Sequence, residues 1–270
     1  HAAPTSATLR QFAETLLSIG LTVLLVDLLR DPAALRRLVL VVIVAAGTQA
    51  LVALVLYAMP DDLAERTLVR LARLGYPDGG VIRYIEDNPA LDERAIGTWV
   101  DPNALGGILA VTAAMIAPQV FASRPVLRYR WLTLGVLGLV ALALFLTYSR
   151  ASMLAFAVGL AFISLFKPYR RYLGLMLVGA ALLLVLPQTQ DYIQRFADAF
   201  TASDLATQMR LGEYSDSLRL ISRYPITGVG FTGTPEIDIY TDVANMYLMM
   251  ANQIGLVGLG LFLLTMLAVF

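Results

Sequence analysis

The chain has 270 residues, of which 58% are hydrophobic and 15% charged, and its mean hydropathy is +0.71. This composition excludes a water-soluble globular domain and indicates a membrane protein, with no nucleic-acid partner expected. Because the sequence has no cysteine and one histidine, disulfides and His/Cys metal sites are excluded as well. A carboxylate-bound Mg²⁺ or Ca²⁺ remains open, but we expect neither a metal nor another cofactor.

Apolar windows predict about seven membrane spans. They are residues 12–29, 38–59, 104–122, 131–148, 151–166, 172–187 and 244–270. We therefore predict an all-α fold, a polytopic membrane helix bundle with a single transmembrane domain over residues 1–270. Because the chain opens on a histidine and closes inside an apolar run, we expect it to be a fragment of a longer protein.

The loops between these spans differ in charge. Short loops rich in arginine and lysine are residues 30–37, 124–130 and 167–171, and the positive-inside rule makes their side cytoplasmic. Two long loops, residues 60–103 and 188–243, then face outward, and each holds more acidic than basic residues. Loops of this length are uncommon without a function, so we expect short helices and the active site on that face.

The first long loop contains a predicted amphipathic helix over residues 61–74. Its leucines and arginines recur at helical spacing. Two interpretations stay open: a helix lying in the membrane interface, or an ordinary surface helix that packs on the bundle.

Arg150 is the only charged residue in the apolar stretch of residues 131–166. A helix of roughly 36 residues would be about 54 Å long, well beyond the ~30 Å hydrocarbon core. The stretch must therefore fold into two spans with a turn at residues 148–152. A charge at such a turn marks a candidate site if it faces a polar cavity, or else its side chain extends to the lipid headgroups.

Several arginines are predicted at or beyond the outer membrane boundary. They are Arg94, Arg150, Arg210, Arg219 and Arg223. A guanidinium group offers a fixed fork of donors that matches phosphate oxygens and stays charged at any relevant pH. A convergence of two or three of them would bind a lipid-linked pyrophosphate. We favour this role for Arg150 and Arg210, and pairing with nearby acids for Arg219 and Arg223.

A glycine-rich stretch at residues 228–233 matches the pattern G-x-G-x-x-G. The dinucleotide-binding form of this pattern needs a preceding strand and a following helix, and prolines flank it here instead. We interpret it as an outer loop that comes close to backbone or ligand.

Four segments in order resemble the O-antigen ligase and O-antigen polymerase superfamily of bacterial membrane glycosyltransferases. They are Gly97 to Asn103, with Pro-Asn before a span; Leu146-Thr147-Tyr148-Ser149-Arg150-Ala151; Arg210 followed by Tyr224-Pro225-Ile226-Thr227-Gly228-Val229-Gly230; and Ala244-Asn245-Met246-Tyr247-Leu248 followed by Ile254-Gly255-Leu256-Val257-Gly258. The resemblance covers the chain from about Arg94 to its end.

The resemblance implies a donor, an acceptor and a set of site residues. The donor would be an undecaprenyl-pyrophosphate-linked glycan at the outer face of the bacterial cytoplasmic membrane, and the acceptor a saccharide or lipid-linked hydroxyl, with no metal. Arg150 and Arg210 would stabilise the charge that grows on the departing pyrophosphate. Arg94 would be a third donor, and Asn103, Asn245 and Tyr247 would contact substrate.

One position departs from the family pattern. Ala244 stands where ligase members carry histidine, which favours a polymerase over a lipid A core ligase. If a base is needed, Glu213 or Asp242 could supply it, because partial burial raises a carboxyl pKa. The alternatives are a transporter or flippase of lipid-linked saccharides, for which broken helices are typical, and a catalytically inactive relative.

Overall fold

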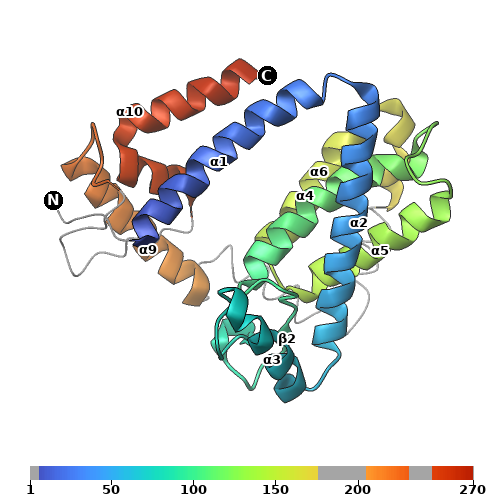
Figure 1. Ribbon diagram of the computed structural model, residues 1–270, viewed down its shortest axis with the longest axis horizontal. Helices are drawn as coiled ribbons and strands as arrows, with labels where there is room; N and C mark the ends of the chain where they lie inside the picture. Colours follow the sequence, from blue (N-terminus) through green and yellow to red (C-terminus); the bar gives the residue numbers. More distant parts are fainter. Residues whose placement is uncertain (1–5, 176–204, 231–244, 270) are drawn as a thin grey trace. The chain divides into compact units, whose positions relative to one another are not determined.

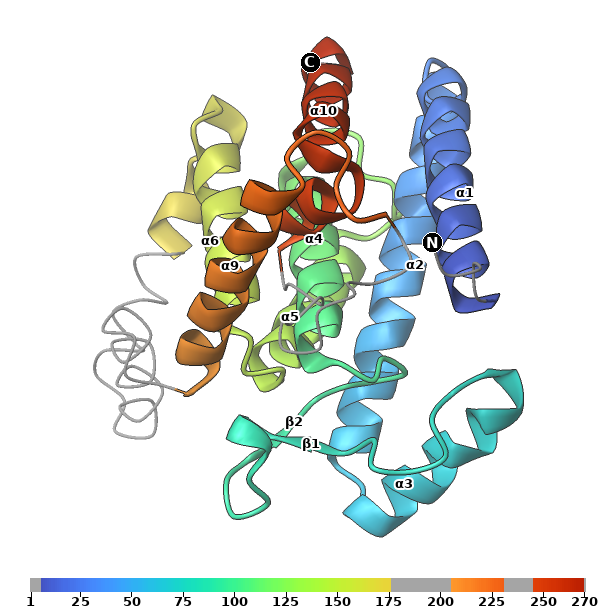
Figure 2. The ribbon, with the colours of Figure 1, turned by 90° about the vertical axis from the view of Figure 1, so that its left-hand side faces the viewer.

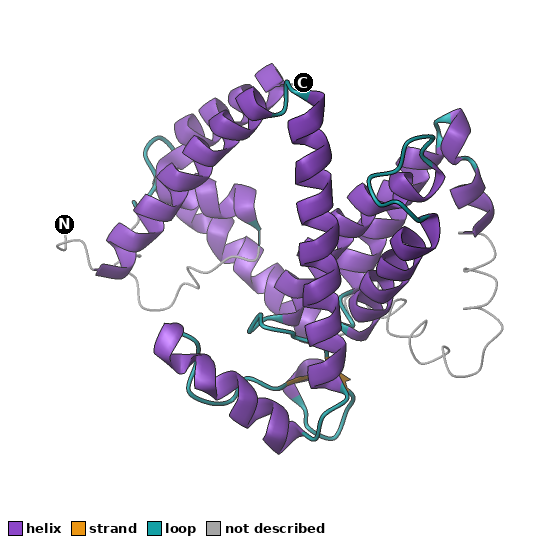
Figure 3. Cartoon of the chain, turned by 45° about the vertical axis from the view of Figure 1, so that its right-hand side comes forward, coloured by secondary structure: helices purple, strands orange, loops and turns teal. Residues whose placement is uncertain are grey.

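The computed structural model describes residues 6–175, 205–230 and 245–269. These residues are mostly helical, and a single two-stranded sheet is seen among them (Figure 3). The chain divides into two compact units, one of residues 28–193 and the other of residues 1–27 with 194–270. The predicted all-α class is confirmed.

The unit of residues 28–193 is built around four helices. They are α2 (Pro32–Tyr57), α4 (Pro102–Phe121), α5 (Arg130–Leu146) and α6 (Arg150–Ser164). Helix α4 is central, because it packs against each of the other three (Figure 1). Side chains of α2, α4 and α5 with Tyr172 form the buried core.

Small side chains allow these helices to approach closely. Ala46, Ala50 and Ala53 lie on one face of α2 at helical spacing, and Ala113 and Ala117 do so on α4; all five are at most 5% exposed. Where lipid surrounds a bundle, helices associate by close packing of such small residues, because lipid tails are as apolar as a leucine side chain. The alanines therefore favour the helix-on-helix contacts over exposure to lipid.

Capping residues define where two of the helices begin. Asp31 accepts hydrogen bonds from the backbone nitrogens of Ala33 and Ala34 at 3.1 and 3.2 Å, at the start of α2. Asp101 accepts one from Asn103 N at 2.8 Å, with Pro102 in the first position of α4. Carboxylates suit helix starts because they satisfy unpaired N–H groups and face the positive end of the helix dipole.

Residues 60–101 form a compact segment at one end of α2 (Figure 2). It contains α3 (Asp61–Val69), η1 (Arg70–Leu74), β1 (Arg83–Tyr84), η2 (Ile85–Asp87) and β2 (Glu93–Arg94). The strands pair antiparallel, Arg83 opposite Arg94 and Tyr84 opposite Glu93. Ala64 and Leu68 of α3 are buried against Leu56, Val81 and Ile96. This packing favours the surface-helix interpretation of residues 61–74.

The described part of the chain contains three helices long and apolar enough to cross a membrane, α2, α4 and α10 (Met246–Val269). Helices α5 and α6 coincide with predicted spans but have 17 and 15 residues, about 26 and 23 Å of helix. Helix α1 (Ser6–Leu28) coincides with the first predicted span. The prediction for residues 172–187 lies mostly outside the described residues, so the count of seven stays a prediction.

The other unit contains α9 (Leu205–Arg223), the short helix expected within the second long loop, and α10. Helix α10 is not continuous, because Gly255 has φ 71° and ψ 179° and interrupts it. The span predicted over residues 244–270 is therefore broken within its length. The backbone of residues 225–230 occupies the break.

Three backbone hydrogen bonds join this loop to the interrupted helix. Val229 N donates to Asn252 O at 2.7 Å, Gly230 N to Gln253 O at 2.9 Å, and Leu256 N to Pro225 O at 2.8 Å. Gly228 and Gly230 have φ of 66° and 80°, values that few residues except glycine adopt. Gly228 thus allows the close approach to backbone that the sequence predicts, because a Cβ atom there would lie 2.4 Å from Asn252 O.

A substitution at Gly255 tests this joint. A Cβ atom there would lie 2.0 Å from Ile226 O, and the positive φ adds strain, so Gly255→Ala is expected to destabilise the protein by at least about 2 kcal/mol. Gly260→Ala is the matched control, because nothing lies within 4 Å of its Cβ position. The measurement is the thermal unfolding midpoint of the two variants in detergent. Equal midpoints would contradict the described joint.

Candidate functional site

The connection between α5 and α6 is a tight turn of three residues, Thr147 to Ser149. Tyr148 has φ 51°, a left-handed conformation that is uncommon for residues other than glycine. Thr147 and Ser149 are buried, at 0% and 3% exposure, and half-buried Arg150 is the first residue of α6. The structure thus confirms that the apolar stretch of residues 131–166 is broken. The predicted bounds of the turn, residues 148–152, were wrong, because Arg150 already begins α6 instead of lying within the turn.

The residues around the turn hold α6 close to α4. Ser149 and Ser152 share a hydrogen bond of 2.8 Å between their side-chain oxygens. A Cβ atom at Gly106 of α4 would lie 2.8 Å from Ser152 Oγ, so only glycine lets α4 come this near. Arg150 therefore projects from a helix start with little freedom to shift, and the positive end of the α6 dipole adds to its charge.

Two other predicted site residues lie beside this turn. The Nε of Arg94 donates to Thr147 O at 2.8 Å, and its Nη2 donates to Asn103 Oδ1 at 2.9 Å. Asn103 is the second residue of α4. Three candidates that the sequence spreads over 57 positions, Arg94, Asn103 and Arg150, therefore occupy one end of the bundle.

Acidic and phenolic side chains lie next to the turn as well. The hydroxyl of Tyr148 donates to Asp92 Oδ2 at 3.4 Å and also hydrogen bonds with Tyr57. Burial, then the nearby charge of Asp92, raises the pKa of Tyr148 to about 12. Tyr148 is therefore a neutral donor at any physiological pH.

Glu93, next to Arg94 in β2, is a carboxylate that was not among the candidate site residues predicted from the sequence. Burial, followed by the negative charge of Asp61, raises the pKa of Glu93 to about 7. An acid with such a pKa can accept and release a proton near neutrality. The sequence around Glu93 does not predict this raised pKa, because the pKa depends on how deeply the β1–β2 hairpin is buried.

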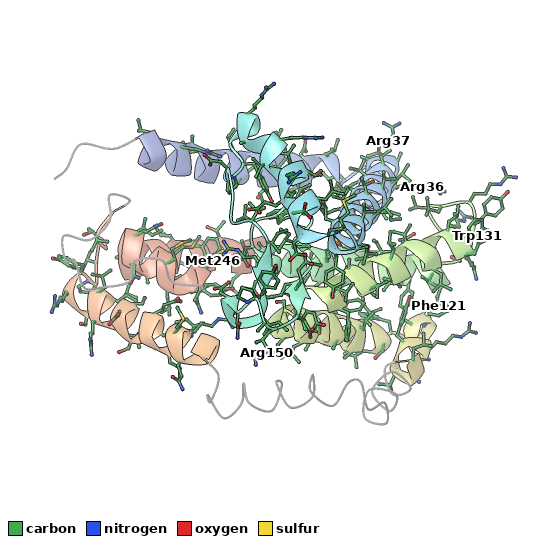
Figure 4. All side chains as sticks on the ribbon, turned by 90° about the horizontal axis from the view of Figure 1, so that it is seen from below. Arg36, Arg37, Phe121, Trp131, Arg150 and Met246 are labelled. Carbon is green, nitrogen blue, oxygen red and sulfur yellow. The ribbon has the colours of Figure 1, made fainter. Side chains whose placement is uncertain are left out.

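The opposite end of the bundle is basic. Arg36 of the first basic loop donates to Pro125 O at 3.2 Å, and Arg130 donates to Ala122 O at 3.0 Å. The guanidinium of Arg171 lies 5.7 Å from the ring centre of Phe121, at the end of α4. All three predicted basic loops therefore meet at one end, where Figure 4 shows Arg36, Arg37, Phe121 and Trp131, with Arg150 toward the other end.

The length of helix α4 gives the distance between these two ends of the bundle. It runs for 20 residues, about 30 Å, from the Arg94–Asn103 contact to the carbonyl that Arg130 binds. This length equals the hydrocarbon thickness of a typical bilayer. The bundle thus carries basic loops at one boundary of an apolar layer and the Arg150 turn at the other.

In the other unit, α9 carries Arg210 and Glu213. Arg210 is exposed and Glu213 is half-buried, and residues three apart lie on neighbouring positions of a helix surface. Arg219 forms an ion pair with Asp216 at 3.3 Å, which confirms the pairing that the sequence analysis favoured. Asp242, the second candidate base, lies outside the described residues.

Asn245 and Tyr247 lie at the start of α10. Asn245 Oδ1 accepts hydrogen bonds from Tyr247 N at 3.0 Å and Leu248 N at 3.2 Å, so it acts as a helix cap. Its amide nitrogen is the group available for a ligand contact, and the ring of Tyr247 is 51% exposed. The predicted substrate contacts of both residues stay predictions.

Arg150 and Arg210 lie in different units, so their predicted convergence on one cavity stays a prediction. Among residues 6–175, 205–230 and 245–269, no group of three or more His, Cys, Asp or Glu side chains could hold a metal ion. The chemistry that these residues offer is a fixed positive charge at a membrane boundary, together with carboxyl groups near it.

The raised pKa of Glu93 makes stability depend on pH. The folded state holds the proton more tightly than an unfolded chain, whose glutamates titrate near 4.5. The stabilising contribution is therefore complete below pH 4.5 and lost as the pH rises through 7. Glu93→Gln should remove this loss, so its melting temperature should rise relative to wild type between pH 5 and about 8.

The control for this prediction is Asp62→Asn, which removes a carboxylate that is 72% exposed in the same segment. A difference between wild type and Glu93→Gln that stays constant from pH 5 to 8 would show that Glu93 titrates in its ordinary range.

Comparison with known proteins gives one match. Residues 135–263 match the family described as O-antigen ligase, a range that contains α6, α9 and most of α5 and α10, with Arg150, Arg210 and Asn245. No curated protein matches the chain, and no solved structure does. This match supports the resemblance of the chain to the O-antigen ligase and polymerase superfamily.

Proposed function

We propose that the protein is a membrane glycosyltransferase that takes glycan from an undecaprenyl-pyrophosphate donor at the outer face of the bacterial cytoplasmic membrane. The observation that carries this proposal is the position of Arg150 within the matched family range. It begins α6 at the end of the bundle away from the three basic loops. The positive-inside rule favours a cytoplasmic location for those loops, and hence an outer location for Arg150.

The reaction would be a displacement at the anomeric carbon of the donor sugar. The bond from that carbon to the pyrophosphate oxygen breaks, and a bond to the acceptor hydroxyl oxygen forms. Negative charge grows on the pyrophosphate as it leaves. Arg150 and Arg210 are proposed to stabilise this charge, and fixed donors of this kind act strongly where water is excluded.

The proton of the acceptor hydroxyl needs a base. Glu213 is the favoured candidate for this base, because it is half-buried and lies one helical turn from Arg210. Asp242 remains the other. Ala244 has no group that can take a proton, which supports a polymerase rather than a lipid A core ligase. Asn245 and Tyr247 are proposed contacts for the sugar or phosphates, whereas Arg94 and Asn103 are hydrogen-bonded to each other beside the turn.

The interruption of α10 bears on the transporter alternative, because discontinuous helices are typical of transporters. In such helices the exposed backbone groups bind the transported substrate. Here Asn252 O, Gln253 O and Leu256 N are bonded to the loop of residues 225–230 instead. The break therefore offers a ligand no backbone groups at these positions, and glycosyl transfer is the better-supported function.

An activity assay tests the mechanism. Purified full-length protein is supplied with a defined undecaprenyl-pyrophosphate oligosaccharide, and chain elongation or acceptor transfer is measured. Arg150→Ala and Arg210→Ala should each lower the rate by about 10²- to 10³-fold, the usual effect of losing one donor to a growing negative charge. Arg219→Ala is the control, because that arginine is 70% exposed and paired with Asp216.

Each outcome of this assay is informative. Unchanged rates in Arg150→Ala and Arg210→Ala would remove the assignment of the two arginines. Absence of product with the wild type, under conditions in which it binds the donor, would favour the inactive-relative or transporter alternative.

A labelling experiment tests the proposed sidedness. Because the sequence lacks cysteine, single cysteines can be introduced at exposed Ala90 and exposed Ser123 with little change in size. In intact cells with a permeable outer membrane, a membrane-impermeant maleimide should label Ala90→Cys and leave Ser123→Cys unlabelled until the cells are lysed. The reverse pattern would place Arg150 on the cytoplasmic side and end the proposal.

A further inference from the structure

The end of α5 depends on a segment more than fifty residues earlier in the chain. The last carbonyls of a helix have no partner within it and must be satisfied from outside. At this helix end, Ala143 O, Leu144 O and Phe145 O accept from Thr147 N and Tyr148 N. The next two carbonyls accept from residues of the first long loop.

These two acceptors are Leu146 O and Thr147 O. Ala95 N donates to Leu146 O at 2.8 Å, and Arg94 Nε donates to Thr147 O at 2.8 Å. Thr147 is fully buried, so water could not easily replace Arg94 as the partner of its carbonyl, and loss of the arginine would leave that carbonyl unpaired. A positive group is also favoured there by the negative end of the α5 dipole.

Arg94 makes a second contact, which links the turn to helix α4. Its Nη2 donates to Asn103 Oδ1 at 2.9 Å, and Asn103 belongs to the first turn of α4. One guanidinium thus joins the end of α5 to the start of α4. Lysine could not replace it, because a single ammonium group lacks the fixed fork that reaches both acceptors.

Arg150 follows Thr147 by three residues, across the left-handed Tyr148. The backbone that the guanidinium of Arg94 holds is therefore the backbone from which Arg150 projects. Catalytic groups need a position fixed to a fraction of an ångström, and a loosened turn would lose this even if Arg150 itself were intact.

We propose that Arg94 is a positioning residue, which holds the α5–α6 turn through Thr147 O and Asn103 so that Arg150 meets the phosphate group of the substrate. This inference rests on the proposed phosphate-binding role of Arg150. It gives Arg94 a role different from the third phosphate donor that the sequence analysis expected. The two roles differ in whether the effect of Arg94 passes through Arg150.

A double-mutant cycle separates these roles. The binding of inorganic pyrophosphate to purified full-length protein is measured for wild type, Arg94→Ala, Arg150→Ala and the double variant. If Arg94 acts only through Arg150, Arg94→Ala should weaken binding about tenfold or more in the wild type and have almost no effect once Arg150 is absent. If Arg94 contacts phosphate directly, the two effects should multiply, which would overturn the proposal.

A second measurement does not depend on binding or activity. Hydrogen–deuterium exchange of the amides in residues 146–152, without any ligand, should become about ten- to a hundredfold faster in Arg94→Ala, the range for one lost hydrogen bond to a charged group. Arg83→Ala is the matched control, because Arg83 is the cross-strand partner of Arg94 but contacts Val100 O and Asp87. Exchange that is unchanged in Arg94→Ala would overturn the proposal.

The Asn103 contact has its own pair of variants. Asn103→Asp keeps an oxygen that accepts from Arg94, so the turn should stay protected from exchange, whereas Asn103→Leu should loosen it. Equal protection in both would show that the link to α4 does not hold the turn.

The failure of the proposed function would be recognised separately. If Arg150→Ala leaves pyrophosphate affinity unchanged, the phosphate-binding role of Arg150 is wrong and the positioning of Arg150 for phosphate falls with it. Faster exchange in Arg94→Ala would then show that the capping of the turn exists but serves another purpose.

Discussion

Backbone groups left over where a helix stops or breaks must find partners, and in an apolar bundle only distant parts of the same chain can supply them. A carbonyl left unpaired away from water costs several kcal/mol by transfer estimates. Two such cases in the described residues lie next to segments that carry the family motifs. Arg94 and Ala95 satisfy the end of α5, and the loop of residues 225–230 satisfies the interruption of α10.

The two solutions use different residues for one purpose. At the end of α5, one donor is the backbone N–H of Ala95 and the other is the side chain of Arg94. The guanidinium of Arg94 donates to the carbonyl of Thr147 and to the side-chain amide of Asn103. At α10 the donors and acceptors are all backbone, which requires an approach so close that Gly228 and Gly255 cannot carry a Cβ atom. In both places the interruption lies next to a segment that resembles a family motif, so the helix breaks and the candidate site coincide in sequence.

Charged residues of opposite sign gather at the two ends of the bundle of α2, α4, α5 and α6. The basic loops gather around the carboxyl end of α4, where Arg130 binds a terminal carbonyl, and the acidic hairpin lies at its amino end. The separation of about 30 Å suits a bilayer. Asp92, which accepts from Tyr148, and Glu93, next to Arg94 in β2, lie at the same end of the bundle as the turn that precedes Arg150.

The sequence by itself determined the class of fold, the presence of helices near most predicted spans, the break in the apolar stretch close to Arg150 and the ion pair of Arg219. These follow from local properties: apolar length against membrane thickness, and oppositely charged residues three positions apart on a helix. The family motifs likewise consist of neighbouring residues, and for this reason they were readable without a structure.

Only the tertiary structure decided that Arg94 bonds both Thr147 O and Asn103, that Gly255 breaks α10, and that Glu93 has a raised pKa. Each depends on contacts between segments far apart in the chain, or on the depth at which a group is buried. Hydrophobic periodicity continues unchanged through Gly255, so the apolar run predicts one helix where a loop inserts its backbone. The reason is general: a linear pattern records which residues are apolar or charged, whereas the partner of a buried polar group is chosen by packing.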